Sequence, residues 1–205
     1  GKLQPGETLT IINGRISGRC FDRPLDAPHE RVPTTISHLD QLFEDTVYHH
    51  QLSDVPFGMF LSGGVDSSAL LAMMTRLNET AVAAYSLRFD SQSVSDETEK
   101  ARIIARRTGA EFIDVSYDKD IFWKQAGYAA LSCDEPAADY AILPSLCLAE
   151  RASRDVKVVL SGEGGDEFFA GYGRYRANRR VVGGKALWRA GPALSSAILR
   201  DDIAS

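Results

Sequence analysis

The sequence predicts an α/β fold, in which a doubly wound parallel sheet is preceded by an N-terminal β-hairpin. Three observations predict it. Short apolar runs typical of buried strands alternate with helical patterns from residue 34 onward. Two Gly-rich loops each follow one of these runs, and an Asn-Gly pair separates two strand-like runs near the N-terminus. Strands that alternate with helices favour parallel pairing with right-handed crossovers.

The composition is typical of a globular protein. The chain has 205 residues, of which 44% are hydrophobic, enough for one sizeable domain and part of another. The net charge of −5 gives no reason to expect a nucleic acid or an anionic membrane as partner. No apolar run could span a bilayer and no secretory signal opens the chain. The three cysteines show neither metal nor disulfide spacing, so we expect a cytoplasmic protein.

Residues 1–30 differ in character from the rest. Residues 9–16, with Asn13-Gly14 in the middle, predict a hairpin with a type I′ turn. The prolines in residues 23–28 predict a linker. An isolated hairpin is marginally stable in water. We therefore expect it to belong to a β-rich domain outside this sequence, or to pack on the main domain, which we assign to residues 31–205.

Four strands and five helices are predicted after the linker. The strands are residues 57–61, 81–87, 112–115 and 156–160. The helices are residues 34–47, 67–77, 95–108, 121–131 and 143–152. Ser95 is the predicted N-cap of the third helix and Gly109 its C-cap, and Pro56 separates the first helix from the first strand.

The two Gly-rich loops, residues 62–68 and 161–167, are the main functional signal. Glycine permits backbone conformations and close approaches that a Cβ would block. The exposed N–H groups at the start of a following helix attract anions. In doubly wound sheets ligands bind beyond the carboxyl ends of the strands. Both loops and the segment Arg88-Phe89-Asp90 begin at predicted strand ends, so we expect them to converge on one edge of the sheet.

The first loop is not of the Walker type, because no lysine follows Gly63 or Gly64. Its serine hydroxyls and backbone N–H groups would have to hold the phosphates. A metal ion is then the natural way to neutralise a polyphosphate, and Asp66 is placed to bind it. Taken alone, the same residues could form only a turn and a helix cap.

The second loop concentrates negative charge. Glu163, Asp166 and Glu167 lie within five residues, and unpaired carboxylates this close repel one another. A bound cation would relieve the repulsion, although a solvated acidic helix start is the alternative. The aromatic residues Phe168 and Phe169 that follow are expected to pack rather than to bind bases.

Residues 53–68 and 159–172 resemble the two signature segments of the glutamine-dependent (class B) asparagine synthetase family. The first segment is shared among ATP pyrophosphatases, whereas the second narrows the match to asparagine synthetases and relatives such as β-lactam synthetases. Residues 134–139 resemble a segment lining the acceptor side. The resemblance covers most of residues 31–180 and implies a fold of the adenine nucleotide alpha hydrolase-like type. Residues 1–22 resemble the tail of the family's glutaminase domain.

The resemblance also implies roles for individual residues. Two positions match those whose backbone holds adenine, namely Leu61 and Leu87. The positions that match the pyrophosphate loop are Ser62, Gly63, Gly64, Ser67 and Ser68, and a further nucleotide contact matches Ser161 and Gly162. The matches to Mg²⁺ ligands are Asp66 and Asp166. Glu163 matches a catalytic residue needed to form the acyl-adenylate.

The implied activity is ATP-dependent amide formation with ATP and Mg²⁺ as cofactors. Aspartate would be activated as acyl-AMP with release of pyrophosphate, and ammonia from a glutaminase domain would then give the amide. Relatives that activate another carboxylate, in β-lactam, macrocycle or polysaccharide amide formation, remain alternatives. So does an ATP-binding fragment without turnover. We expect no nucleic-acid or membrane partner, and a homodimer is left open.

The sequence departs from the family pattern in two places. The glutaminase domain with its amino-terminal cysteine nucleophile is not in this sequence, so we expect no glutamine hydrolysis. Lys185 is the only lysine after Asp166, and it is a poor match for the family's downstream catalytic lysine. We therefore expect that the domain in residues 31–205 is truncated at its C-terminus.

Overall fold

The computed structural model describes residues 2–22, 35–90, 97–133, 139, 141–169 and 171–173. The chain divides into two compact units, Gly1–Leu42 and Phe43–Ser205. Each unit is described by itself below.

The first unit contains the predicted hairpin. Strand β1 (Glu7–Ile12) pairs antiparallel with β2 (Arg15–Phe21), and the register shifts between Thr10 and Ile11. The two turn residues, Asn13 and Gly14, both have positive φ angles, 51° and 75°. A type I′ turn requires this conformation at both central positions, so the Asn-Gly prediction is confirmed. The predicted linker lies outside the described residues.

Helix α1 (Ile36–His50) begins in the first unit and ends in the second. The Thr35 hydroxyl accepts a hydrogen bond from the backbone N–H of His38 at 3.1 Å, as an N-cap residue does. Two residues from the later part of the helix, Phe43 and Val47, contribute to the core of the second unit. The helix ends before the predicted break that leads to Pro56.

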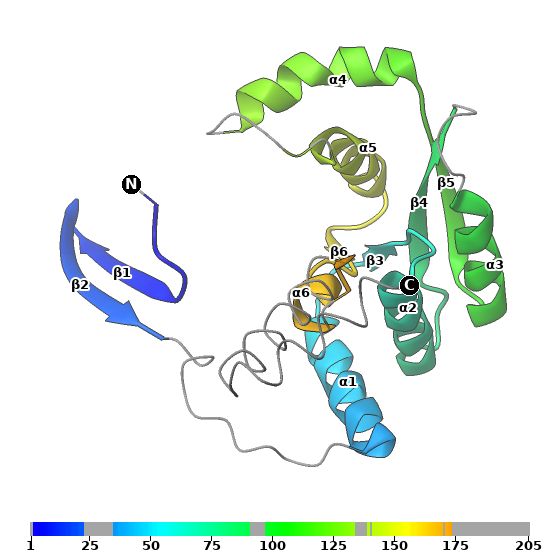
Figure 1. The fold of residues 1–205 in the computed structure, drawn as a ribbon, viewed down its shortest axis with the longest axis horizontal. Coiled ribbons are helices and arrows are strands. Elements are labelled where there is room, and N and C mark those ends of the chain that lie inside the picture. Colours follow the sequence, from blue (N-terminus) through cyan, green and yellow to red (C-terminus); the bar gives the residue numbers. More distant parts are fainter. Residues whose placement is uncertain are drawn as a thin grey trace, which may run out of the picture. The chain divides into compact units, whose positions relative to one another are not determined.

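A four-stranded parallel sheet forms the centre of the second unit (Figure 1). Its strands are β3 (Phe57–Phe60), β4 (Ala83–Phe89), β5 (Glu111–Tyr117) and β6 (Val158–Leu160), in the order β5-β4-β3-β6. The chain runs outward from β3 through β4 to β5 and then returns to the other side of β3 with β6. The winding of the sheet therefore reverses between β3 and β6, which is the topological switch point where such sheets bind ligands.

Helices cover both faces of this sheet, so the doubly wound α/β prediction is confirmed. On one face, α2 (Val65–Leu77), α3 (Thr98–Thr108) and the later part of α1 surround Met59 and Ala84. On the other face, α5 (Ile142–Ala152) covers Tyr85, and α4 (Lys119–Ser132) with α5 covers Val115. The alternation of these core residues along β3 to β5 follows the period of two that a strand imposes.

Several element ends differ from the prediction, among them the starts of helix α3 and strand β6. Helix α3 begins at Thr98 with Glu97 as its N-cap, and the predicted cap Ser95 lies outside the described residues. Its predicted C-cap is confirmed, because Gly109 has φ 77° and its N–H bonds to the carbonyl of Ala105. Strand β6 starts at Val158 rather than residue 156. The Val156 N–H bonds instead to the last turn of α5, at 2.9 Å from the carbonyl of Ala152.

The cysteines form no disulfide: Cys20 is exposed, Cys133 half-buried and Cys147 buried, each with a free thiol. In the parts of the chain that the structure describes, no helix combines the length and the hydrophobicity needed to cross a bilayer.

Candidate functional site

The first Gly-rich loop joins β3 to α2 and is organised by its serine hydroxyls. Ser62 Oγ lies 3.0 Å from Ser67 Oγ and accepts the N–H of Gly64 at 3.2 Å. The Ser67 and Ser68 hydroxyls both donate to the carbonyl of Gly64, at 3.3 and 2.5 Å. Ser67 is buried, whereas Ser62 and Gly64 are exposed. The predicted loop residues therefore form one hydrogen-bonded turn whose exposed side lies at the start of α2.

The start of α2 has no side-chain cap. Its N-cap residue is Gly64, which offers no acceptor. Among the described residues, no hydrogen bond occupies the N–H groups of Val65, Asp66 and Ser67. Unpaired N–H groups and the positive end of the helix dipole favour an anion at this position. The α2 terminus thus has the chemistry of an anion site.

The second Gly-rich loop joins β6 to the short helix α6 (Gly165–Phe169). Gly164 has φ 93°, a left-handed conformation that favours glycine. The N–H of Glu163 lies 3.4 Å from Ser161 Oγ, and the Glu163 side chain is exposed. This turn reverses the chain directly after the strand that neighbours β3.

The two loops meet in backbone contact. A Cβ built on Gly162 would lie 2.9 Å from the backbone nitrogen of Ser67 and 3.3 Å from the carbonyl carbon of Asp66. One built on Gly165 would lie 2.5 Å from Oδ2 of Asp66. A side chain at Gly162 would require the backbone of the first loop to move, whereas one at Gly165 would displace the Asp66 side chain. The second loop therefore packs directly on the first turn of α2, at the switch point of the sheet.

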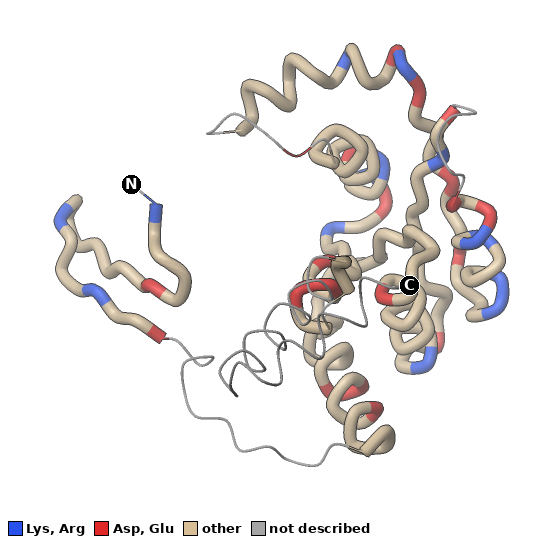
Figure 2. The backbone as a smooth tube through the Cα atoms, viewed as in Figure 1, with Lys and Arg blue, Asp and Glu red and all other residues tan. Residues whose placement is uncertain are grey.

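The predicted carboxylates are distributed around this contact. The Asp66 carboxylate lies against Gly165, the residue before Asp166, whereas the Asp166 carboxylate lies beside Gly171. Figure 2 shows acidic residues at the starts of α2, α3 and α6 and basic residues in the last turns of α2 and α3. The described residues include no cluster of three or more His, Cys, Asp or Glu side chains that could hold a metal ion.

The structure adds one element that the sequence did not indicate, the first turn of α3. A Cβ on Gly63, which has φ 79°, would meet the Ala101 nitrogen at 3.0 Å, the Glu97 carbonyl at 3.2 Å and the Lys100 Cβ at 3.2 Å. This turn thus forms a wall of the first loop. Nothing in the local sequence distinguishes it from an ordinary acidic helix start.

The two leucines matched to adenine contacts lie at the carboxyl ends of neighbouring strands. Leu61 is buried, and its N–H bonds to the carbonyl of Tyr85 at 2.8 Å. Leu87 is half-buried, and its carbonyl accepts the Thr98 hydroxyl at 3.2 Å. Arg88, at the same end of β4, forms ion pairs with Asp90 at 3.0 Å and Asp114 at 3.3 Å.

Two further sequence predictions, for the aromatic residues of α6 and for the acceptor side, were not confirmed. The aromatic prediction for α6 was wrong, since Phe168 and Phe169 are 80% and 75% exposed. The segment matched to the acceptor side, residues 134–139, lies almost wholly outside the described residues, as does Lys185.

Comparisons with known proteins identify relatives of this chain. The sequence profile of the family described as asparagine synthase matches residues 38–205. The chain is 31% identical over 180 residues to asparagine synthetase [glutamine-hydrolyzing] 1 of Bacillus subtilis (strain 168), covering 85% of this chain and 28% of that protein. It is 33% identical over 140 residues to amidase chyE of Penicillium rubens, covering 62% of this chain and 21% of that protein. The chain thus spans under a third of the length of the curated relatives it matches.

Among solved structures, a glutamine-dependent NAD⁺ synthetase from Acinetobacter baumannii aligns with a TM-score of 0.48 at 21% identity, over 78% of this chain and 35% of that one. Because the family profile covers most of the sequence, including both Gly-rich loops, the chain belongs to the asparagine synthase family.

Proposed function

We propose that the paired loops bind the phosphate chain of ATP, and that the domain uses ATP to activate a carboxylate for amide formation. The observation that carries this proposal is the contact between Gly162 and the start of α2 at the switch point of the sheet. It brings both family signature segments to one place, although they lie about a hundred residues apart in the sequence.

The first loop supplies the anion-binding groups in this proposal. The unpaired N–H groups of α2 and the exposed hydroxyl of Ser62 would face the pyrophosphate part of ATP, in place of a Walker lysine. Ser67 and Ser68 hold the turn through Gly64 and would keep these donors in place. Ser161 and Gly162 would complete the nucleotide contacts from the second loop.

Asp66 and Asp166 are the residues that we propose to bind Mg²⁺. Asp66 is exposed, and its carboxylate lies against Gly165, the residue before Asp166 in the second loop. When bound, the ion would neutralise charge on the pyrophosphate leaving group. The remaining ligands would come from phosphate oxygens and water, because the described residues offer no larger carboxylate cluster.

The proposed reaction has two steps. A carboxylate oxygen of the substrate attacks the α-phosphorus of ATP, the bond from that phosphorus to the bridging oxygen breaks, and pyrophosphate leaves. Ammonia then attacks the acyl carbon, AMP leaves with the former carboxylate oxygen, and the nitrogen loses a proton. The protein would act mainly by positioning two anions that repel each other and by stabilising the departing charge. We assign Glu163, exposed beside the loop contact, to the first step.

We propose aspartate as the carboxylate and glutamine-derived ammonia as the nitrogen source, because the Bacillus subtilis relative is a glutamine-hydrolysing asparagine synthetase. On the same basis, we propose that residues 1–30 belong to the ammonia-supplying glutaminase domain and residues 31–205 to the ATP-binding domain. The three free thiols support a reducing, cytoplasmic location.

A second candidate is the same chemistry on another carboxylate. The relative named amidase chyE supports it, because that protein shares the matched region and carries a different name for its activity. The acceptor side of the site decides between the two candidates.

Exchange of labelled pyrophosphate into ATP tests the first step. We expect exchange that depends on a carboxylate substrate and is greatest with aspartate in a panel of amino acids and dicarboxylic acids. The variants Asp66→Asn and Asp166→Asn should lose it by at least about 100-fold, the loss expected when transition-state charge is left unstabilised. Asp120→Asn, at the exposed start of α4, is the matched control and should keep it. Absence of exchange with every carboxylate, despite ATP binding, would contradict the enzymatic proposal for this chain.

A further inference from the structure

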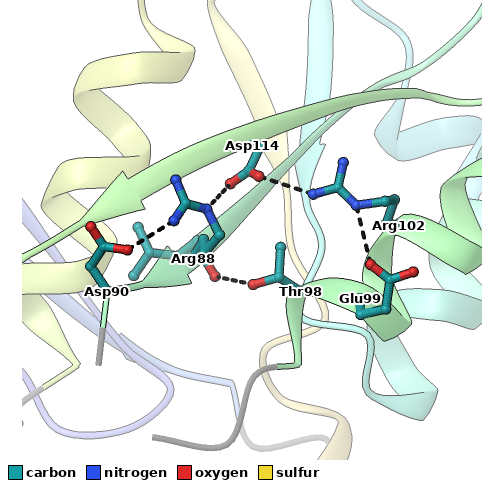
Figure 3. A network of polar contacts seen from close by, with 7 residues as sticks. Arg88, Asp90, Thr98, Glu99, Arg102 and Asp114 are labelled. Atoms are coloured by element: carbon teal, nitrogen blue, oxygen red, sulfur yellow. Dashed lines mark hydrogen bonds and ion pairs between the residues drawn. The ribbon is translucent and has the colours of Figure 1, made fainter. Parts of the chain in front are cut away.

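Thr98 connects helix α3 to Leu87, the strand residue matched to an adenine contact. Its hydroxyl donates to the carbonyl of Leu87 at 3.2 Å, and Thr98 itself is only 3% exposed. Figure 3 shows Thr98 with this bond as a dashed line. A carbonyl oxygen has two lone pairs. The Thr98 hydroxyl uses one of them, so the other can accept a second donor.

The same helical turn contacts the phosphate loop. Glu97 and Ala101, on either side of Thr98, present backbone atoms within 3.2 Å of where a Cβ on Gly63 would lie. The first turn of α3 therefore touches Leu87 on β4 and Gly63 after β3. These are the residues matched to the adenine end and to the phosphate end of the nucleotide.

Helix α3 has a second attachment that does not involve Thr98. Arg102, one turn further along, forms an ion pair with Asp114 on β5 at 3.0 Å and with Glu99 at 3.4 Å. Its guanidinium also lies 4.7 Å from the centre of the Phe112 ring. Figure 3 shows Asp114 between Arg102 and Arg88. Together with the burial of Ala101, these contacts should hold α3 against the loop even without the Thr98 hydroxyl.

We propose that Thr98 is a positioning residue for the adenine base. By donating to the Leu87 carbonyl, it holds that peptide group in one orientation, in which the second lone pair of the carbonyl oxygen accepts an N–H of the purine. This inference rests on the proposed function, because it assumes that the nucleotide lies between Leu87 and the first loop. It assigns to Thr98 a part in base recognition that is separate from phosphate binding.

The test compares two ligands that share a phosphate chain. Mg-ATP and Mg-tripolyphosphate are titrated calorimetrically into the 205-residue chain and its variants. Thr98→Val keeps the side-chain shape but removes the hydroxyl, and Thr98→Ser keeps the hydroxyl. Arg102→Gln is the matched control on the same helix, since it removes an exposed ion pair and leaves the Thr98 bond in place.

We expect Thr98→Val to weaken ATP binding about 3- to 10-fold, the effect of one hydrogen bond. Tripolyphosphate binding should change less than about 2-fold by the same measure. Thr98→Ser should restore ATP affinity, and Arg102→Gln should alter neither ligand. Equal weakening of both ligands by Thr98→Val would show a general structural role and overturn the inference, as would unchanged ATP affinity.

The wild-type titration separates this inference from the proposed function. If the wild-type chain binds neither ligand, the proposed ATP site itself is wrong, and the role of Thr98 in base recognition is wrong with it. If the wild-type chain binds both ligands and the variants do not separate them, only the inference fails.

Discussion

Gly162 lies against the first turn of α2, so close that a Cβ on it would be 2.9 Å from the backbone nitrogen of Ser67. The two residues come from the two Gly-rich loops, which follow the neighbouring parallel strands β6 and β3. The contact requires glycine because of space, since backbone atoms rather than a flexible side chain stand in the way. It is the structural reason why the two loops lie together at one end of the sheet.

Replacing Gly162 by alanine should therefore destabilise the domain. The added methyl group would force the second loop away from α2, at a cost of about 1 to 3 kcal/mol in the free energy of unfolding, as overpacked sites usually show. Urea denaturation followed by circular dichroism measures this cost. Gly127→Ala is the control, because a Cβ at Gly127 in helix α4 meets nothing within 4 Å. That change should be neutral or stabilising by up to about 1 kcal/mol. Equal stability of the two variants would contradict the described contact.

Although its side chain is buried, Ser67 should matter for nucleotide binding. Its buried hydroxyl contacts Ser62 Oγ at 3.0 Å and donates to the carbonyl of Gly64 at 3.3 Å. Ser67→Ala removes both contacts and leaves the loop free to change shape. We expect Mg-ATP affinity to fall by about 3- to 10-fold, which corresponds to one hydrogen bond.

Fluorescence competition with a labelled ATP analogue measures the change in affinity. Ser132→Ala is the control, since its hydroxyl donates to the Tyr128 carbonyl within α4, away from both loops. An affinity in Ser67→Ala equal to that of the control would show that the hydroxyl does not shape the site.

Tyr85 should make stability depend on pH in the alkaline range. Burial, with the hydrogen bond that its hydroxyl donates to Asp155 at 3.0 Å, raises the pKa of Tyr85 from 10.0 to about 12. Between these values the unfolded chain loses the tyrosine proton before the folded chain does. The contribution of the neutral hydroxyl is thus complete below pH 10.0 and is lost as the pH rises toward 12.

Tyr85→Phe tests this dependence, because it keeps the ring in the core under α5 and removes the ionisable group. The stability difference between wild type and Tyr85→Phe should be constant from about pH 7 to pH 10 and should shrink above that range. Urea titrations at a series of pH values measure the difference. A difference that stays constant up to pH 12 would contradict the raised pKa.

Much of the fold could be predicted, because its signals are local. The Asn13-Gly14 turn needs positive φ at both positions, and few other residue pairs satisfy this. The apolar runs before both Gly-rich loops are strands, and the doubly wound pattern follows from their alternation with helices. Gly109 ends α3 because glycine, which lacks a Cβ, readily adopts the left-handed conformation found there.

Other features depend on tertiary contacts that no local pattern encodes. The Thr98 bond to Leu87 joins segments separated by residues that carry no periodic signal. The exposure of Phe168 and Phe169 is the opposite of what their hydrophobicity suggests.

The sequence indicated which residues lie at the candidate site more completely than it indicated how their side chains are arranged. The strand ends brought Ser62 and Ser161 to one edge of the sheet, as parallel pairing of β3 with β6 requires. The sequence could not show that Asp66 rests on Gly165 while the Asp166 carboxylate turns toward Gly171. Side-chain directions at a loop contact depend on both backbones, and those are fixed only when the loops meet.

The most direct test of the proposed ATP site is the midpoint of thermal unfolding measured against Mg-ATP concentration. A ligand that binds only the folded state at 100 times its dissociation constant adds about 2.7 kcal/mol, which corresponds to a rise of about 5 to 10 °C for a chain of this size. We predict this rise in the wild-type chain and in Gly127→Ala, and its loss in Asp66→Asn and Gly162→Ala. No rise in the wild-type chain at saturating Mg-ATP, or an equal rise in Gly162→Ala, would contradict a nucleotide site built from the two loops.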